Sequence, residues 1–133
     1  MSHRFSILLF LIGCCLICQA KKGKVSNLLP PEGCLMENIT YKNTPQGEQR
    51  LDIYLPAANT SAQFPVIVFI HGGSWMHGSK DGITQREWIR LMLKSMLQAG
   101  YAVVSIDYRL VNDSITVVYP SPLADCKDAV KWV

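Results

Sequence analysis

The sequence is poor in charged residues and in cysteine, and it carries no compositional bias. Charged residues make up 17% of the 133 residues, and a net charge of +3 gives no electrostatic basis for binding nucleic acid. Five cysteines are too few for a miniprotein built on disulfides, and nine glycines with seven prolines exclude a collagen-like or low-complexity chain. Because 49% of the residues are hydrophobic, an intrinsically disordered chain is excluded as well. The length suits about one globular domain.

The start of the chain has the three parts of a secretory signal peptide. Arg4 supplies a positive charge, residues 5–17 are almost entirely apolar, and small residues precede a cleavage site after Ala20. The apolar run is shorter than the ~20 residues that a transmembrane helix needs. We therefore predict a signal peptide over residues 1–20 and an exported chain, secreted or periplasmic.

An alternative interpretation of the same segment is a lipoprotein signal. Residues 11–14, Leu-Ile-Gly-Cys, resemble a bacterial lipobox, in which cleavage before Cys14 leaves a lipid-bearing cysteine. That cleavage would, however, leave an apolar, cysteine-rich start to the mature chain at residues 15–18. We expect a membrane location only if Cys14 is lipidated.

Export sets the redox conditions for the two cysteines that follow the signal peptide. Cys34 and Cys126 could pair in an oxidising compartment, or they could remain buried thiols, since their separation in sequence does not fix their separation in space. Three sites match the acceptor pattern for N-glycosylation, which has meaning only in a eukaryote: Asn38, Asn59 and Asn112.

The mature chain opens with a polar leader, residues 21–36, and continues with an alternating pattern. Residues 37–42 and 49–55 alternate apolar and polar side chains around a turn that contains Pro45 and Gly47. In the second segment Leu51, Ile53 and Leu55 share one face, with Asp52 and Tyr54 on the other. We predict an antiparallel edge hairpin with one polar face.

A βαβ unit follows the hairpin. Residues 65–70 are a continuous apolar run rich in β-branched side chains, which favours a strand covered on both faces, and residues 101–106 are interpreted as a second buried strand. Residues 84–99 between them have helical spacing, and residues 123–133 begin another helix with Ala124, Ala129, Val130 and Val133 apolar. The first helix is predicted to present one stripe to the core: Trp88, Leu91, Met92, Ser95 and Met96. The pattern predicts an α/β fold with a parallel sheet.

A glycine-containing loop comes directly after the first buried strand. Its sequence is His71-Gly72-Gly73-Ser74-Trp75, followed by Gly78-Ser79-Lys80. Adjacent glycines let a backbone turn sharply and bring bare N–H groups close to a bound atom, which suits the negative oxygen of a tetrahedral intermediate. A pair of glycines alone would equally suit a tight turn without a ligand. The extended motif at the end of a strand is more specific.

This motif and its surroundings resemble the esterase/lipase branch of the α/β-hydrolase fold, in which such a loop follows the third strand. The resemblance covers residues 37–133, with segments 49–56, 101–110 and 119–129 similar to the family's second strand, fourth strand and next helix. It is nearest to feruloyl- and acetyl-xylan-esterase-like hydrolases, with carboxylesterases and kynurenine formamidases as neighbours. It implies an α/β-hydrolase fold, a three-layer αβα arrangement around a mostly parallel sheet, of which this is the N-terminal half with its antiparallel edge hairpin.

The resemblance also implies a site. The backbone N–H groups of Gly72, Gly73 and Ser74 would be the oxyanion donors, and no cofactor or metal is implied. The nucleophile motif Gly-x-Ser-x-Gly is absent from this sequence, so the catalytic serine, acid and histidine are expected beyond Val133. We therefore expect an exported serine esterase that acts on small-molecule or carbohydrate-linked esters through an acyl-enzyme, represented here by its oxyanion-hole half. The alternative is a catalytically inactive, truncated hydrolase-like module.

The remaining polar residues near this loop are assigned structural roles. His71 precedes the expected nucleophile and is interpreted as shaping the loop, while Trp75 is expected to pack beneath it. Asp107 and Arg109, at the end of the second buried strand, are expected to pair with each other. Ser74 has no neighbouring base and is not a candidate nucleophile. His3 and His77 lack the spacing of a metal site.

Overall fold

A computed structural model describes residues 25, 27–57, 63–111 and 116–133 of the chain. The predicted signal peptide, Cys14, Asn59 and Asn112 lie outside these described residues. Within the described ranges, no helix has the length and apolar character needed to cross a membrane.

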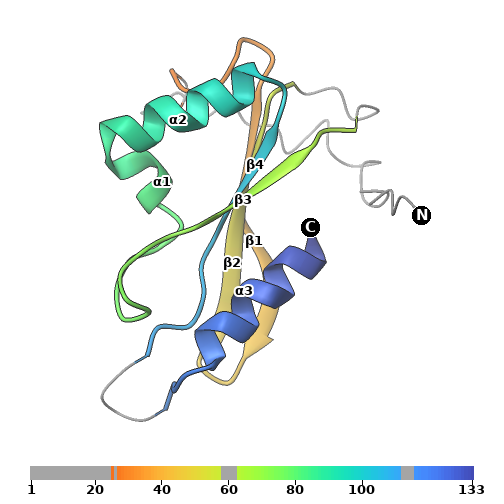
Figure 1. Ribbon diagram of the computed structural model, residues 1–133. Coiled ribbons are helices and arrows are strands. Elements are labelled where there is room, and N and C mark those ends of the chain that lie inside the picture. Colours follow the sequence, from red (N-terminus) through yellow and green to blue (C-terminus); the bar gives the residue numbers. More distant parts are fainter. Residues whose placement is uncertain (1–24, 26, 58–62, 112–115) are drawn as a thin grey trace, which may run out of the picture.

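The described strands form one four-stranded sheet in the order β1-β2-β4-β3 (Figure 1). The strands are β1 (Cys34–Thr44), β2 (Gly47–Leu55), β3 (Val66–Ile70) and β4 (Ala102–Ile106). β2 pairs antiparallel with both β1 and β4, whereas β3 and β4 pair in parallel. The predicted hairpin and the predicted parallel βαβ unit are therefore both present, and they join through β2 and β4.

The expectation of one polar face on the hairpin is wrong for β2. Leu51 is buried on one face of the strand, and Asp52 and Tyr54 are buried on the other. The reason is that both faces of β2 are covered: Tyr54 packs in the cluster that contains Leu93 and Leu97, and Leu51 packs in the cluster that contains Cys126 and Ala129. The hairpin also starts earlier than predicted, at Cys34, and Gly47 takes the turn position with a φ of 120°.

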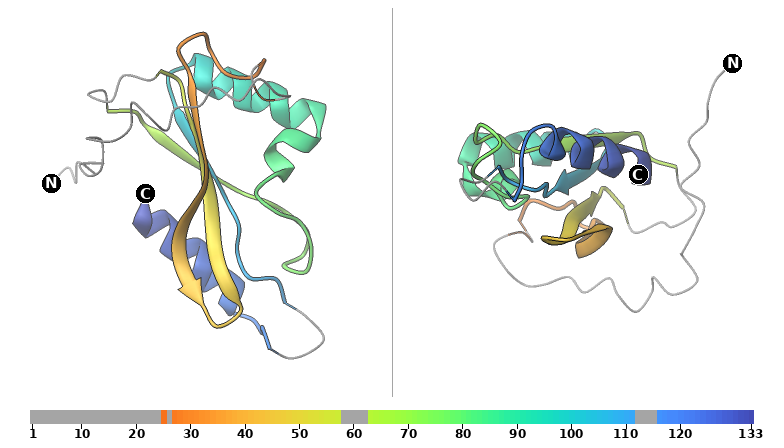
Figure 2. Two further views of the ribbon diagram at one scale, coloured as in Figure 1. Left: turned by 180° about the vertical axis from the view of Figure 1, so that it is seen from behind. Right: turned by 90° about the horizontal axis from the view of Figure 1, so that it is seen from below.

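Helices lie on opposite faces of the sheet. Consecutive residues of β4 show this, because Val103 packs in a cluster with α2 (Glu87–Gln98) and Val104 packs in a cluster with α3 (Ser121–Trp132). Side chains alternate along a strand, so the two helices cover different faces. Figures 1 and 2 show α2 and α3 on either side of the strands.

The predicted helix over 84–99 is two helices, α1 (Gly82–Gln85) and α2, because Arg86 has an extended backbone between them. The core stripe of α2 consists of Ile89, Leu93 and Leu97, spaced four residues apart. The predicted stripe is wrong in three members, since Trp88 and Leu91 are 62% and 59% exposed and Ser95 is exposed as well. The true face is rotated by one residue, about 100° around the helix, and Met92 and Met96 pack at its margin.

The burial of α3 adds a detail that the apolar pattern did not give, and the burial of β3 corrects an expectation. The buried face of α3 consists of Pro122, Asp125, Cys126 and Ala129, while the apolar Val130 and Ala124 are exposed. β3 is only half-buried and Ile70 is exposed, because within the described residues β3 has a neighbouring strand on one side only.

Both cysteines are buried thiols, and no disulfide joins them. Cys34 opens β1, and Cys126 lies on the face of α3 that packs against the sheet. Burial, with a smaller contribution from the nearby Asp125 carboxylate, raises the pKa of the Cys126 thiol to about 11. Of the two alternatives left open by the sequence, the pair of buried thiols is the one observed.

Candidate active site

The loop after β3 lies at the carboxyl end of the two parallel strands. β3 ends at Ile70 and its neighbour β4 ends at Ile106, so His71 and Asp107 leave the sheet at the same edge. This edge is where open α/β sheets hold their ligands. The sequence prediction therefore places its candidate site at the edge that the fold makes available.

Gly73 is a sterically required turn residue, whereas Gly72 is not. Gly73 has a φ of 123°, and a side chain there would collide with the backbone carbonyl of His77. The Gly73 carbonyl accepts hydrogen bonds of 3.0 Å from the amides of Met76 and His77, which closes the turn. A Cβ on Gly72 would meet nothing within 4 Å.

The three predicted donor residues are exposed. Gly72, Gly73 and Ser74 all face solvent, and the backbone hydrogen bonds within the loop are donated by Met76 and His77 instead. Ser74 and Trp75 both have positive φ, 55° and 65°, so the backbone changes direction immediately after the two glycines. A sharp turn built from exposed residues is a backbone arrangement whose N–H groups can receive an anionic oxygen.

His71 is buried beneath this turn and is held from two directions. Its ring stacks on Tyr108 with centroids 4.1 Å apart and planes within 11°, and the Tyr108 hydroxyl donates to the His71 carbonyl at 2.7 Å. Nδ1 of His71 lies 2.9 Å from the Gly72 carbonyl oxygen, which assigns the proton to Nδ1. Nε2 has no hydrogen-bond partner among the described residues.

Trp75 packs under the loop, as its sequence position suggested. Its ring meets Tyr108 edge to face at 5.2 Å, and it contacts the cluster on the α3 side of the sheet. The Trp75 carbonyl accepts a hydrogen bond of 2.8 Å from the amide of Val111. The loop is thereby joined to the segment that follows β4.

Lys80 ends the loop, and its amide, its carbonyl and its ammonium group are all hydrogen-bonded. Its ammonium lies 2.9 Å from a carboxylate oxygen of Asp52 on β2, and its amide donates to the Asp107 carboxylate at 2.7 Å. Its carbonyl accepts a 2.6 Å hydrogen bond from the Ser105 hydroxyl on β4. Only 8% of the Lys80 surface is exposed, which is unusual for lysine.

The expected pair of Asp107 and Arg109 is wrong. Arg109 instead makes a two-pronged ion pair with Asp125 of α3, Nε to Oδ2 at 2.7 Å and Nη2 to Oδ1 at 2.9 Å. The Asp107 carboxylate is turned toward the loop, where it receives the Lys80 amide. Arg109 therefore pairs with the buried Asp125 carboxylate, whose two oxygens both accept hydrogen bonds from the planar guanidinium group.

The Asp125 carboxylate is paired with two cationic side chains from different parts of the chain. Besides Arg109, it accepts a 2.7 Å hydrogen bond from Lys42 of β1, which also contacts Asp128 at 2.6 Å. Burial opposes ionisation of Asp125, but the hydrogen bonds from Arg109 and Lys42 outweigh it and lower its pKa below the usual range. The same contacts raise the pKa of Lys42.

In the Asp52–Lys80 pair, burial and hydrogen bonding combine differently to set the two pKa values. Burial raises the pKa of Asp52, with partial compensation from the Asn38 amide at 2.8 Å and from Lys80. For Lys80, burial acts to lower the pKa, but the hydrogen bond to Asp52 outweighs it and the pKa is raised.

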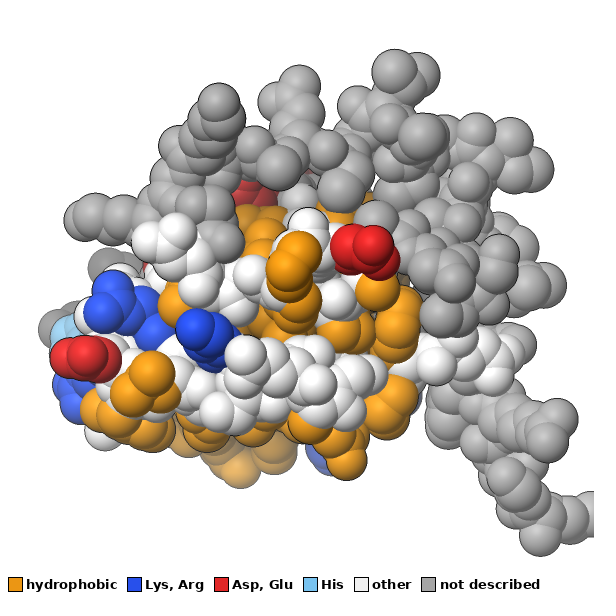
Figure 3. Space-filling view, turned by 90° about the horizontal axis from the view of Figure 1, so that it is seen from above, with side chains coloured by type: hydrophobic (Ala, Val, Ile, Leu, Met, Phe, Trp, Pro, Cys, Tyr) orange, Lys and Arg blue, Asp and Glu red, His pale blue; other side chains and the backbone are white. Residues whose placement is uncertain are grey.

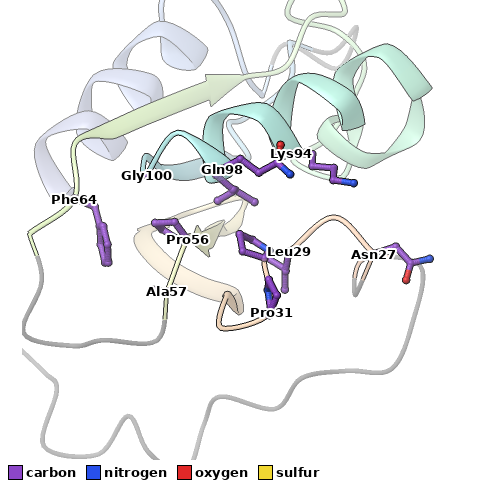
Figure 4. Close-up of a pocket in the computed structure, with 11 residues that line it drawn as sticks. Asn27, Leu29, Pro31, Pro56, Ala57, Phe64, Lys94, Gln98 and Gly100 are labelled. Carbon is purple, nitrogen blue, oxygen red and sulfur yellow. The ribbon is translucent and has the colours of Figure 1, made fainter.

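The described residues contain no group of three potential ligands that could hold a metal ion. They do contain a cavity of about 620 Å³ at the other end of the molecule (Figures 3 and 4). Its walls come from the segment before β1, from the ends of β2 and α2, and from the residues just before β3 and β4, among them Leu29, Pro31, Pro56, Phe64, Lys94 and Gln98. It lies at the amino ends of the parallel strands and is not part of the candidate site.

Sequence reasoning missed the residues that anchor the loop. Asp52, Lys80 and Ser105 are buried polar residues; the burial of Asp52 and Lys80 was not expected, and neither was the role of Ser105 as a partner of Lys80. Asp52 and Ser105 interrupt apolar runs, which is the signal that could have indicated them. The partner of each, however, is 25 to 28 residues away in the chain.

The chain is similar to known proteins, among them solved esterases. A family model, BD-FAE, matches residues 51–133. Esterase 2 of Thermogutta terrifontis in its apo form is 28% identical with a TM-score of 0.60, over 77% of this chain and 35% of that one. A structure of the same esterase phosphorylated by paraoxon gives a TM-score of 0.61 over 77% of this chain and 36% of that one.

Segments of much larger proteins are also similar. The non-reducing polyketide synthase mapC' of Penicillium brevicompactum is 31% identical over 113 residues, which is 84% of this chain and 5% of the synthase. Methylphloroacetophenone synthase of Cladonia uncialis is 28% identical over 124 residues, 86% of this chain and 4% of that protein. The chain thus spans about a third of the solved esterase and a small part of these multidomain synthases.

The mixed sheet and the similarity to solved esterases identify an esterase-like α/β-hydrolase fold, of which this chain is the N-terminal portion. The chain belongs to the BD-FAE family.

Proposed function

We propose that this chain is the oxyanion-hole half of an exported serine esterase that hydrolyses carboxylic esters through an acyl-enzyme. Its substrates would be small-molecule or carbohydrate-linked esters. The observation that carries the proposal is the turn at Gly73, with Gly72, Gly73 and Ser74 all exposed residues. Membership of an esterase family and the esterase structures support the same chemistry.

The proposed chemistry depends on where charge develops. When a nucleophile adds to an ester, the carbonyl oxygen becomes an oxyanion, and fixed N–H groups favour that state over the ground state. In this proposal Gly72, Gly73 and Ser74 donate to that oxygen. One such donor contributes ~3–4 kcal/mol to lowering the barrier. The serine nucleophile, its base and its acid would come from polypeptide beyond Val133, since this sequence contains no Gly-x-Ser-x-Gly.

Export is part of the proposal and rests on the sequence of residues 1–20. The chain would be secreted or periplasmic after cleavage at Ala20, or held at a membrane if it is lipidated at Cys14. Mass spectrometry of the mature N-terminus distinguishes these outcomes. A first residue at Lys21 supports the cleaved signal peptide, a lipid-modified Cys14 supports the anchor, and an intact Met1 contradicts both.

The experiment for activity uses the full-length polypeptide that contains this segment. We expect hydrolysis of p-nitrophenyl acetate and progressive, stoichiometric inactivation by paraoxon, the compound that phosphorylates the similar Thermogutta esterase. The 133-residue segment alone is the matched control and should show neither, because oxyanion donors without a nucleophile lack most of the catalytic machinery. A full-length polypeptide that neither turns over esters nor binds paraoxon covalently would favour the inactive module instead.

A further inference from the structure

We propose that Lys80 is a positioning residue for the candidate oxyanion loop and that it acts through Gly78 on His71. The inference deepens the proposed esterase function and rests on it. The segment 78–80, which we call the return limb, leads the chain from the turn back to the sheet. It touches no substrate in this proposal; its role is to hold the donors in place.

The first step is the anchoring of the return limb to the sheet. Lys80 uses three groups at once, since its amide, its carbonyl and its ammonium are hydrogen-bonded to Asp107, Ser105 and Asp52 respectively. These partners come from β2, from β4 and from the residue that follows β4. All three bonds lie between 2.6 and 2.9 Å, so residue 80 is fixed in position and in direction.

The second step is the contact between the return limb and the start of the loop. Gly78 has a φ of 104°, and a Cβ built on it would collide with Nδ1 of His71 and lie 2.7 Å from the Gly72 carbonyl oxygen. The return limb therefore lies directly against both groups. Tyr108 stacks on the His71 ring. His71 is thus enclosed by Tyr108 and by a limb whose end is fixed by Lys80.

The third step is the effect of the His71 position on the direction in which the Gly73 N–H points. Nδ1 of His71 donates to the Gly72 carbonyl at 2.9 Å, which aims that carbonyl toward the buried ring. Because a trans peptide is planar, its C=O and N–H point in opposite directions. The N–H of Gly73 therefore points away from His71, toward the exposed side of the turn. Displacing the return limb would release the carbonyl and, with it, the direction of this donor.

Two substitutions loosen the anchor without stranding a buried charge on Asp52 or Lys80. Ser105→Ala removes the hydroxyl that donates to the Lys80 carbonyl, and Asp107→Ala removes the acceptor of its amide. Asp107→Asn keeps an oxygen that can accept the same hydrogen bond and serves as the conservative variant. Ser95→Ala is the matched control, since the Ser95 hydroxyl also donates to a carbonyl, that of Leu91, but on the exposed side of α2.

The kinetic test uses the full-length polypeptide and p-nitrophenyl acetate. We expect Ser105→Ala and Asp107→Ala to lower kcat by about tenfold or more while KM stays within about twofold, because a misdirected donor weakens transition-state binding alone. Asp107→Asn should recover most of the lost kcat, and Ser95→Ala should match the parent. Equal kcat in all variants would overturn the inference, as would a rise in KM at constant kcat.

A second measurement decides the inference even if the parent hydrolyses no ester, an outcome that would count against the proposed function alone. The amides of Met76 and His77 are hydrogen-bonded to the Gly73 carbonyl, so their exchange with deuterium reports whether the turn is held. We expect faster exchange at both amides in Asp107→Ala, parental exchange in Ser95→Ala, and intermediate or parental exchange in Asp107→Asn. Unchanged exchange in Asp107→Ala, or an equal increase throughout the sheet, would show that Lys80 has only a general structural role.

Discussion

The hydroxyl of Tyr108 donates a hydrogen bond of 2.7 Å to the backbone carbonyl of His71, across 37 residues of sequence. The bond joins the segment after β4 to the first residue of the candidate oxyanion loop. Both groups are buried, so the bond is not weakened by competition with water. Tyr108 therefore fixes the backbone at the point where the loop leaves the sheet.

Tyr108→Phe should remove this hydrogen bond and keep the ring that stacks on His71. We expect a loss of about 1 kcal/mol in the free energy of unfolding, as for a typical buried hydrogen bond, measured by urea denaturation of the full-length polypeptide. Tyr101→Phe, on a more exposed tyrosine, is the control and should change the free energy little. Equal effects of the two substitutions would argue against the importance of the bond.

Gly73→Val should abolish the turn geometry, because a β-branched residue strongly resists a φ of 123° and its Cβ would strike His77. In the full-length enzyme we expect kcat to fall by about 10²–10³ through a displaced donor, with KM little changed. Gly82→Ala is the control, because a Cβ there makes only an ordinary contact with His71. Intact kcat with a raised KM would mean that the oxyanion assignment is wrong.

Asp125 should govern part of the acid sensitivity of the fold. Its pKa is lower in the folded state than in the unfolded chain, so its contribution to stability is fully present above the unfolded value of about 3.9 and is lost as the pH falls through the folded value. Asp125→Asn should lower stability at pH 7 and flatten its decline below about pH 4. The partly exposed Asp128, which shares Lys42, provides the control: Asp128→Asn should have a much smaller effect. Denaturation curves at several pH values test this.

The buried face of α2 can be checked by a pair of substitutions. Leu93→Ala should cost about 2–5 kcal/mol, since Leu93 is fully buried, whereas Trp88→Gln should cost far less because Trp88 is largely exposed. Thermal unfolding of the full-length polypeptide gives the comparison. A larger loss of stability for Trp88→Gln than for Leu93→Ala would support the buried face that the sequence alone predicted.

The 133-residue segment, expressed without residues 1–20, should be aggregation-prone or only marginally folded. Half-buried β3 presents a free edge among the described strands, and Ile70, Trp132 and other large side chains are exposed. Sedimentation and thermal unfolding measure the outcome. A monomer with one cooperative transition would contradict the expectation.

Local patterns were sufficient to predict the strands and the parallel pair. Continuous apolar runs identified β3 and β4, and alternation with a turn identified β1 and β2. The resemblance to esterases correctly gave the α/β-hydrolase fold. These features depend on neighbouring residues, which a sequence shows directly.

The errors concern relationships that only the tertiary structure determines. The polar face expected on β2 assumed a side open to solvent, but Tyr54 on that side packs against α2 and Asp52 is buried beside Lys80. Arg109 was paired with Asp107, its neighbour in sequence, although α3 brings the better placed Asp125 to it. In α2, the face that packs against the sheet is displaced by one residue from the predicted face, so that Ile89, Leu93 and Leu97 are buried instead. The sequence motif located the loop correctly, but the residues that hold it lie on other strands.

The anchoring of Lys80 also constrains the order in which the chain can become structured. Ser105, Asp107 and Tyr108 are made after the loop during synthesis, by 25 residues or more counted from Lys80 or His71. Until they leave the ribosome, the loop lacks these hydrogen-bond partners, and little holds Ser74 and Trp75 at their unfavourable positive φ. We therefore expect the candidate oxyanion hole to form late in folding, when β4 takes its place between β2 and β3.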